Sequence, residues 1–517
     1  MPPASALEAR GIVKTYPGGV TANAGVDLNV APGEVHAVVG ENGAGKSTLM
    51  KVLFGIERPD SGDISIGGRT VHFAGPSEAI AAGIGMVFQH FSLVPSFQVF
   101  ENIVLGSEPR AGLALNRKAA IADVRALSSA FRLFVDPLAP VATLPVGQQQ
   151  RVEILKALYR KAKILILDEP TAVLAPQEVQ ELFAAVRLLV SQGRTVIFIA
   201  HKLPEVLEIS DSVTVLRAGK AIWHGKAKGL NERQLATLMV GREINLRVKR
   251  STKPHEELAC RIEHLDIVDD RGVAVCTDIS LDVRGGEIVG VVGVEGNGHA
   301  ELIEGVAGLR PVARGKITIG GRDLVPLSVQ ERRDCGLASI PEDRLSIGLA
   351  PGATIAENLV ATRLRDRRYV RRGLLDRGAM DRMARALIQR FSVRAGGPQT
   401  RAATLSGGNM QKIVVARELA EQPVLLLVNQ PTRGVDLQAT QFIWRALTEA
   451  ADASAGLLLS SADLSEVLTL CDRVVVLFRG RIVAAFRNSD ALSAETLGLY
   501  MLGLATQTAD EMRKALP

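Results

Sequence analysis

A glycine-rich segment at residues 40–47, GENGAGKS, carries the clearest chemistry in the sequence. It matches the pattern G-x-x-x-x-G-K-S, follows the apolar run Val35–Val39, and precedes a helix-compatible segment, Thr48–Phe54. In this order the backbone N–H groups of the loop and the start of the helix both face a phosphate. Lys46 can reach the β- and γ-phosphate oxygens, and Ser47 offers a hydroxyl to Mg²⁺. The segment predicts a nucleotide-phosphate site.

Two carboxylates follow another apolar run. Asp168 and Glu169 come directly after Ile164–Leu167, which predicts a buried strand. Ligands of parallel sheets bind at the carboxyl ends of the strands. We therefore expect Asp168 to hold Mg²⁺ through water and Glu169 to polarise the water that attacks the γ-phosphate. Such carboxylates are often plain surface residues, but these two follow a phosphate loop at the right distance.

The elements that position these residues alternate along the chain. Continuous apolar strands that alternate with helices indicate a parallel sheet covered on both faces. Residues 97–143 look largely helical and are expected to form a separate subdomain. In the first half we predict strands at Val35–Gly40, Ile84–Phe88, Lys163–Asp168, Thr195–Ala200 and Ser212–Arg217, and helices at 46–54, 76–82, 118–133, 148–160 and 177–191.

The second half of the chain repeats the first. PGEVHAVVGENGAGKS aligns with GGEIVGVVGVEGNGHA, and LPVGQQQRVEILKAL aligns with LSGGNMQKIVVAREL. A polar, charged stretch separates the two copies. We therefore predict domains at 1–245 and 258–517 joined by a linker at 246–257, which is too short to be a domain itself.

Composition narrows the classes of function. The basic residues behind the net charge of +6 are scattered, which disfavours a nucleic-acid groove. We find no apolar signal core at the N-terminus and no run of about eighteen apolar residues that would span a bilayer. The cysteines are widely spaced without C-x-x-C, so we expect no metal site and four buried, inert thiols at Cys260, Cys276, Cys335 and Cys471.

The motifs resemble, in order, those of ATP-binding cassette proteins. Gly40–Ser47 resembles the Walker A loop, Gln89 the Q-loop and Leu144–Gln148 the signature. The segment 168–171 resembles the end of the Walker B strand with its catalytic glutamate, and His201 the switch histidine. The resemblance covers both halves. It implies an α/β fold of two tandem P-loop NTPase cassettes, each with a RecA-like, mostly parallel sheet core, an antiparallel β portion and a helical subdomain.

The resemblance also implies roles by position. Glu169, His201 and Gln89 would be catalytic, and Ser47, Gln89 and Asp168 would hold Mg²⁺. Tyr16 would stack on adenine, although a lone tyrosine is often only a surface residue and His201 alone would often be structural. The residues expected to bind ATP are Tyr16, Gly40, Glu41, Asn42, Gly43, Ala44, Gly45, Lys46, Ser47, Thr48, Ser406, Gly407, Gly408 and Asp436.

In the resembled family, each nucleotide lies between the Walker A loop of one cassette and the signature of the other. The first loop would then meet the intact signature LSGGN at 405–409, giving a complete site. The other site loses the lysine, the hydroxyl, both carboxylates, the histidine and the signature serine, which implies one hydrolytic and one degenerate site. The substituted positions are His299, Ala300, Asn429, Gln430, Ala462, Glu342, Pro145 and Ala175. Nucleotide binding there stays open, because Gly296 and Gly298 keep part of the loop.

Two cassettes without membrane spans look like the ATPase subunit of nucleoside and sugar importers. This implies ATP and Mg²⁺ as cofactors, two integral-membrane permease subunits and an extracytoplasmic substrate-binding protein as partners, no nucleic acid, and a peripheral place on the cytoplasmic side of the cell (inner) membrane. The segment Met86–Gly106 would contact the permease or belong to the subdomain core. QHFSLVP, VEILKALYR and PEDR resemble the nucleoside-type branch more than the ribose or galactose branch, and Pro145 departs from both.

The alternative is a soluble tandem-cassette ATPase that acts on ribosomes. Such proteins usually keep two competent sites and carry a long charged helical linker, whereas the linker here is short. Cassette ATPases of DNA repair would need inserted zinc modules, which the cysteine spacing excludes.

Overall fold

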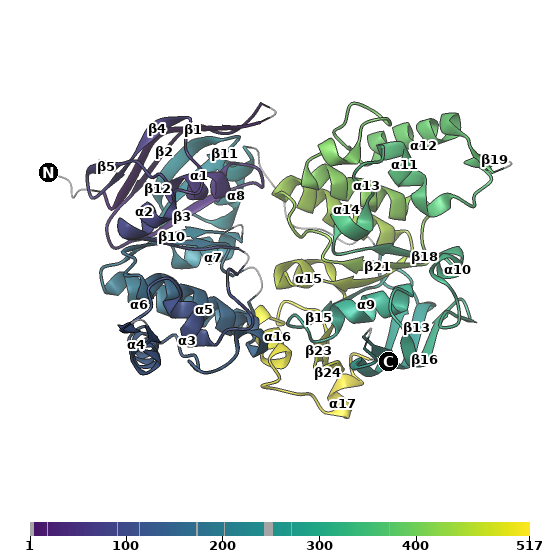
Figure 1. Ribbon diagram of the computed structural model, residues 1–517. Helices are drawn as coiled ribbons and strands as arrows, with labels where there is room; N and C mark the ends of the chain where they lie inside the picture. The colour runs from purple at the N-terminus through teal and green to yellow at the C-terminus, as the bar shows by residue number, and fades with distance from the viewer. Residues whose placement is uncertain are drawn as a thin grey trace. The chain divides into compact units, whose positions relative to one another are not determined.

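The computed structural model forms two compact units, Met1–Ile244 and Asn245–Pro517 (Figure 1). The residues that it describes are 5–17, 19–89, 91–112, 114–171, 174–200, 202–241, 252–269, 271–371 and 373–516. The predicted linker at 246–257 lies partly outside these residues, so its bounds and those of the two domains stay a prediction.

A six-stranded sheet forms the centre of the first unit. Its order is β12-β11-β3-β10-β9-β6, with β12 antiparallel at one edge and the remaining pairs parallel. All five predicted strands are present with ends within one residue, so the predicted parallel sheet is confirmed. The strands are β3 (Val35–Gly40), β6 (Ile84–Val87), β9 (Ile164–Asp168), β10 (Thr195–Ile199), β11 (Ser212–Arg217) and β12 (Lys220–Lys226).

A second, antiparallel sheet of order β2-β1-β4-β5 accompanies it. Helix α1 (Lys46–Leu53) packs its buried side chains, Leu49 and Leu53 among them, in one core with residues from both sheets. The first turn of α1 is therefore held by two sheets at once, which fixes the loop that precedes it. The strands are β1 (Leu7–Tyr16), β2 (Val20–Val30), β4 (Ser61–Ile66) and β5 (Arg69–Val71).

The five helices predicted for the first unit are present, with ends within three residues of the prediction, whereas α7 (Leu203–Ile209) and α8 (Glu232–Val240) were not predicted. Residues 97–143 contain helices, as expected, but also a short hairpin that the sequence did not suggest, because two-residue strands leave no periodic pattern. The elements are α2 (Pro76–Ala81), α3 (Val99–Val104), β7 (Arg110–Ala111), β8 (Ala114–Leu115), α4 (Arg117–Ala130), α5 (Val146–Tyr159), α6 (Pro176–Ser191), α7 (Leu203–Ile209) and α8 (Glu232–Val240).

The second unit repeats this architecture. Its six-stranded sheet has the order β18-β21-β22-β15-β23-β24, and its antiparallel sheet the order β14-β13-β16-β17. The strands are β13 (Leu258–Val268), β14 (Ala274–Arg284), β15 (Ile288–Val292), β16 (Val312–Ile319), β17 (Arg322–Asp323), β18 (Leu337–Ile340), β19 (Val370–Arg371), β20 (Leu374–Leu375), β21 (Leu425–Asn429), β22 (Gly456–Ser460), β23 (Arg473–Phe478) and β24 (Arg481–Arg487). The helices are α9 (His299–Ala307), α10 (Val329–Asp334), α11 (Ile355–Val360), α12 (Arg377–Arg390), α13 (Gly407–Leu419), α14 (Leu437–Asp452), α15 (Leu464–Leu470), α16 (Ala494–Met501) and α17 (Ala509–Met512).

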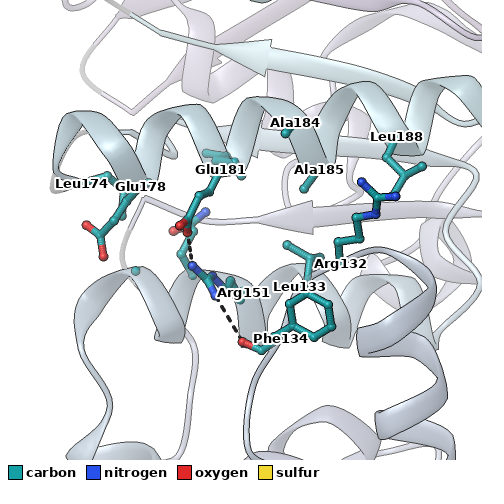
Figure 2. Close-up of a pocket in the computed structure, with 13 residues that line it drawn as sticks. Arg132, Leu133, Phe134, Arg151, Leu174, Glu178, Glu181, Ala184, Ala185 and Leu188 are labelled. Carbon is teal, nitrogen blue, oxygen red and sulfur yellow. Dashed lines mark hydrogen bonds and ion pairs between the residues drawn. The ribbon is translucent and has the colours of Figure 1, made fainter. Parts of the chain in front are cut away.

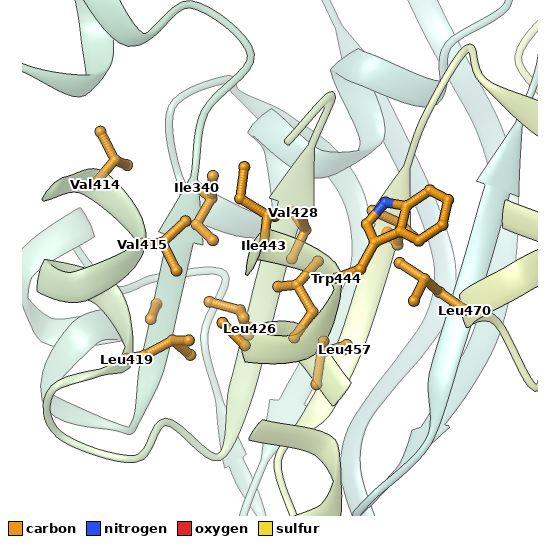
Figure 3. Packing of buried hydrophobic residues seen from close by; sticks show 14 of the residues in the cluster. Ile340, Val414, Val415, Leu419, Leu426, Val428, Ile443, Trp444, Leu457 and Leu470 are labelled. Atoms are coloured by element: carbon orange, nitrogen blue, oxygen red, sulfur yellow. The ribbon is translucent and has the colours of Figure 1, made fainter. Parts of the chain in front are cut away.

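One core of the second unit packs helices α13 and α14 against the parallel sheet (Figure 3). Trp444 belongs to this core, and its Nε1 donates a hydrogen bond of 2.7 Å to Oε1 of Glu466. Glu466 is completely buried. Burial raises the pKa of its carboxyl to about 7, partly opposed by hydrogen bonds from Ser461 and Trp444.

The cysteines are free thiols, and among the described residues no His, Cys, Asp and Glu side chains gather as a metal site. Cys260, Cys276 and Cys471 are buried as predicted. Cys335 is only half-buried, so the prediction was wrong for this residue: it caps the end of α10, near the surface of the unit. In the parts of the chain that the structure describes, no helix has the length and hydropathy needed to cross a bilayer.

Replacing Glu466 by Gln should make stability less dependent on pH. The carboxyl has an ordinary pKa of 4.5 when unfolded and about 7 when folded, so the native protein loses stability as pH rises through that interval. Glu466→Gln should therefore raise the free energy of unfolding at pH 8 by about 3 kcal/mol and by much less at pH 5. Denaturant unfolding followed by Trp444 fluorescence, in a Trp223→Phe background, measures this difference. A gain of equal size at both pH values would contradict the assignment.

Candidate nucleotide-binding site

The glycine-rich loop approaches two neighbouring strands so closely that its glycines are required. Gly45 has φ +97° and caps α1. A Cβ on Gly45 would lie 2.2 Å from the carbonyl oxygen of Ala22 in β2, and one on Gly40 would lie 2.3 Å from that of Leu216 in β11. Larger residues at these two positions would push the loop off the sheets.

Lys46 is held inside the loop. Its side chain is only 6% exposed, and Nζ donates hydrogen bonds to the carbonyl oxygens of Gly40 at 2.7 Å and Glu41 at 3.1 Å. Burial lowers the pKa of Lys46, while the charges of Glu169 and Asp168 oppose that shift. The structure thus brings the predicted lysine and carboxylates close enough to interact.

Asp168 ends strand β9 and is buried. Burial and the charge of Glu169 raise the pKa of its carboxyl to about 6, with Lys46 and Lys51 opposing the rise. A buried carboxylate in this position gains stability from a cation. Asp168 and the exposed hydroxyl of Ser47 supply the oxygen ligands that Mg²⁺ prefers, so these residues fit that ion.

Gln89 and Glu169 meet although eighty positions separate them in the chain. Nε2 of Gln89 donates a hydrogen bond of 2.9 Å to Oε2 of Glu169. Glu169 has φ +48°, and its N–H donates to the carbonyl of Ile199 at 3.0 Å. The contact follows from the sheet order, because β6 and β9 are parallel neighbours whose carboxyl ends lie side by side.

The predicted roles of Tyr16 and His201 are not tested by the structure. The hydroxyl of Tyr16 lies 3.5 Å from Oγ1 of Thr48, so the ring stands beside the start of α1. Its stacking on adenine stays a prediction. His201 lies outside the described residues, and its role also stays a prediction.

Sequence reasoning missed Asn23, which supports the loop from β2. Its Nδ2 donates to the carbonyl of Gly45 at 3.1 Å, and its side chain is completely buried. In the second unit Cys276 takes the equivalent place, where its Sγ donates to the carbonyl of Gly298 at 3.2 Å. Alignment of the two halves of the sequence pairs Asn23 with Cys276. This pairing is the sequence feature that could have identified both residues as supports of the loop.

The second unit keeps the backbone of the loop but not its chemistry. Gly298 has φ +98°, and Gln430 has φ +48°, the value of Glu169. His299 is buried, which lowers the pKa of its imidazole and favours the neutral form. Among the described residues, neither His299 Nδ1 nor Asn429 Oδ1 finds a hydrogen-bond partner. Gln430 instead accepts a hydrogen bond of 3.1 Å from the N–H of Ala462.

The segment LSGGN of the second unit starts helix α13. Oγ of Ser406 accepts hydrogen bonds from N of Asn409 at 3.4 Å and from its Nδ2 at 2.9 Å. Asp436 caps α14 and accepts from N of Ala439 at 2.7 Å. A Cβ on Gly408 would come within 2.9 Å of Cβ of Ala439, so this glycine lets α13 approach α14 closely.

The first unit builds the same two helix ends without these groups. Pro145 precedes α5 and Ala175 precedes α6, and neither caps its helix with a polar side chain.

A cavity of about 300 Å³ lies between α5 and α6, beside the exposed ring of Phe134 (Figure 2). Arg151 bridges it, pairing with Glu181 and donating to the carbonyl of Phe134 at 3.2 Å. None of the residues predicted to bind nucleotide lines this cavity.

Comparison of the sequence with known protein families identifies a nucleotide-binding domain in each unit. The sequence profile described as ABC transporter matches residues 24–172 and 276–433, once in each unit. The chain belongs to the ABC transporter family. Each unit is therefore an ATP-binding cassette, and the protein is an ATPase of this family.

Relatives match over nearly their whole length. The chain is 44% identical to the guanosine import ATP-binding protein NupO of Bacillus subtilis, covering 97% of this chain and 98% of that one. It is 40% identical to the nucleoside import ATP-binding protein NupA of Lactococcus lactis, covering 94% and 96%. It is 41% identical to the glucose import ATP-binding protein TsgD13 of Haloferax volcanii, covering 97% and 96%.

Proposed function

We propose that this ABC protein is the ATP-hydrolysing, energy-coupling subunit of an importer for nucleosides or simple sugars. The observation that carries the proposal is the end-to-end match of both cassettes to relatives named import ATP-binding proteins. The resemblance of QHFSLVP and PEDR to the nucleoside-type branch supports nucleosides as the substrate class. That support comes through shared descent, because these segments need not touch the substrate.

In the proposed hydrolytic site, Lys46 and the loop N–H groups bind the phosphates, and Glu169 positions and polarises the attacking water. Asp168, Ser47 and Gln89 would hold Mg²⁺, which supplies charge neutralisation on the phosphate oxygens when bound. The hydrogen bond between Gln89 and Glu169 supports a shared role for these two side chains. His201 would contact the γ-phosphate.

We further propose that the cassettes pair head to tail, so that Ser406, Gly407, Gly408 and Asp436 complete the site of Lys46. The support is the distribution of substitutions: under this pairing every lost group, from both cassettes, falls in the other site. Random decay would have damaged both sites. Hydrolysis would therefore occur at one site per chain, while the second site, with neutral His299, would not turn over.

The proposed partners are two integral-membrane permease subunits and an extracytoplasmic substrate-binding protein, with the ATPase peripheral on the cytoplasmic side of the membrane. Within the expected contact segment Met86–Gly106, the residues of α3 are largely buried core, whereas Phe97 and Leu105 are exposed. The exposed residues suit a permease surface, and the buried ones belong to the subdomain. The buried side chains support the subdomain-core interpretation, and the exposed ones leave room for the proposed permease contact.

Uptake measurements test the importer function. Deletion of the chain should abolish uptake of labelled nucleoside and leave ribose and galactose uptake intact. Loss of sugar uptake with nucleosides untouched would reject nucleosides but keep the importer. ATP hydrolysis stimulated by ribosomes rather than by reconstituted permease would support the soluble ribosome-associated alternative and reject the importer.

Glu169→Gln should abolish ATP turnover while leaving ATP binding intact, because the loss of a positioned base costs roughly 10²–10⁴-fold. Gln430→Glu is the matched variant at the equivalent turn of the second cassette, and it should add no measurable turnover, since His299 and Ala300 remain. Steady-state hydrolysis and equilibrium ATP binding on both variants decide this. Retention of half the wild-type rate by Glu169→Gln would exclude it as the base.

Ser406→Arg should reduce turnover about as severely as Lys46→Ala, and the double variant should be little worse, because residues that act as one unit are non-additive. Pro145→Ser is the control: it repairs one element of a site that lacks several others, so the hydrolysis rate should stay nearly unchanged. A large gain from Pro145→Ser would contradict the proposed asymmetry, as would normal turnover by Ser406→Arg.

A further inference from the structure

The second cassette carries an ordered turn where the first carries its Q-loop. Pro341 to Asp343 follow strand β18, and Arg344–Gly348 form a single turn of π-helix. Asp343 caps this turn, its Oδ1 accepting hydrogen bonds from N of Leu345 at 2.8 Å and N of Ser346 at 3.1 Å. The turn is therefore fixed locally, and it sets the direction of the side chain of Arg344.

Arg344 connects this turn to the loop before α14. Its Nη1 donates a hydrogen bond of 2.7 Å to the carbonyl of Arg433, and its Nη2 donates one of 3.2 Å to that of Gly434. This loop ends at Asp436, the cap of α14. Two donors of one rigid guanidinium thus hold two successive carbonyls of the Asp436 loop.

The same guanidinium touches the signature. A Cβ placed on Gly407 would lie 2.9 Å from Nη2 of Arg344, so the absence of a side chain at 407 makes room for the arginine. At the other end of the turn, Nη1 of Arg417 in α13 donates to the carbonyl of Gly348 at 2.8 Å. Helix α13 is therefore attached to the turn near both of its ends.

A second contact fixes the Asp436 loop from the same side. The guanidinium of Arg433 pairs with the carboxylate of Glu342, the residue that replaces the Q-loop glutamine. Glu342 is thus used to hold the loop that carries Asp436. The catalytic glutamine position has become part of a structural connection.

The first cassette provides an internal comparison. At the positions equivalent to Arg344 and Gly407 it has Phe91 and Val146, which have no side-chain hydrogen-bond donors. That cassette also has Pro145 in place of the signature serine. Within this chain, the arginine occurs in the cassette whose signature is intact.

We propose that Arg344 is a positioning residue: it holds the signature Ser406–Gly408 and the Asp436 loop in one fixed arrangement for ATP hydrolysis at the Lys46 site. The inference rests on the head-to-tail pairing proposed above. The signature and the Asp436 loop belong to different elements, α13 and the loop before α14, and the guanidinium contacts both. Loss of the Arg344 guanidinium would leave α13 and the loop before α14 folded but would remove the contact that connects them.

The expected effect is on turnover rather than on the first binding of ATP, because the Walker A loop binds nucleotide without the signature. In the full chain, Arg344→Met should lower kcat about tenfold or more while the Kd for ATP changes by less than about twofold. Arg344→Lys should recover part of the loss, because an ammonium can donate to one of the two carbonyls. The double variant with Asp436→Ala should be little worse than Asp436→Ala alone.

Arg363→Met is the matched control. Arg363 also donates to a backbone carbonyl of α13, that of Arg417 at 2.8 Å, but this contact lies near the end of the helix away from the signature. It should leave kcat within about twofold of wild type. Melting temperatures of all variants report folding.

Three results would overturn the proposal. If Arg344→Met keeps normal kcat while Ser406→Arg abolishes turnover, Arg344 has no positioning role and the cassette pairing stands. If Ser406→Arg also keeps normal turnover, the pairing itself fails, and the role of Arg344 with it. If Arg344→Met lowers the melting temperature, ATP affinity and kcat together, and Arg344→Lys restores none of them, the residue is only structural.

Discussion

The site around Lys46 depends on burying opposite charges at one edge of a parallel sheet. Lys46 and Asp168 are both removed from water. Burial lowers the pKa of Lys46 and raises that of Asp168, which favours the neutral form of each. Their mutual attraction and the hydrogen bonds of Lys46 to the loop carbonyls offset part of this cost. A triphosphate would bring negative charge to Lys46, and Mg²⁺ would bring positive charge to Asp168. The two buried charges therefore favour this ligand. The close contacts of Gly40 and Gly45 with the neighbouring strands keep the two charges in register.

The two cassettes show that the fold does not require this charge pair. Gln430 keeps the backbone conformation of Glu169, and Gly298 that of Gly45, although the side chains that carry the chemistry differ. Asn23 and Cys276 likewise support the same carbonyl with different donors. Core packing and glycine geometry therefore hold the frame. The second cassette has Asn429 and Gln430 where the first has Asp168 and Glu169, without loss of the architecture.

The sequence predicted the parallel strands and the loop well, because apolar runs and glycine spacing are local signals. The resemblance to ATP-binding cassettes implied that Gln89 and Glu169 share one site, and the neighbouring parallel strands β6 and β9 do bring the two side chains together. The sequence missed Asn23 and the contacts of Arg344, because both depend on backbone carbonyls distant in the chain. The exposure of Cys335 was wrong for a similar reason: composition does not tell which end of a short helix faces solvent.

Identity to the relatives says little about the transported molecule, and the structure explains why. Relatives named for guanosine, nucleosides and glucose share 40–44% of their residues with this chain. Both units of this chain are built from sheets and helices around a glycine-rich loop, and a substrate in the membrane need not contact them. Under the proposed importer function, selection for substrate would act on this chain through the fit of its surface to a permease. Under the proposed head-to-tail pairing, a second cassette without the hydrolytic groups would still be needed, because its signature would complete the site of Lys46. The hydrogen bonds from Arg344 hold the Asp436 loop, which is part of the surface that the second cassette would contribute under that pairing.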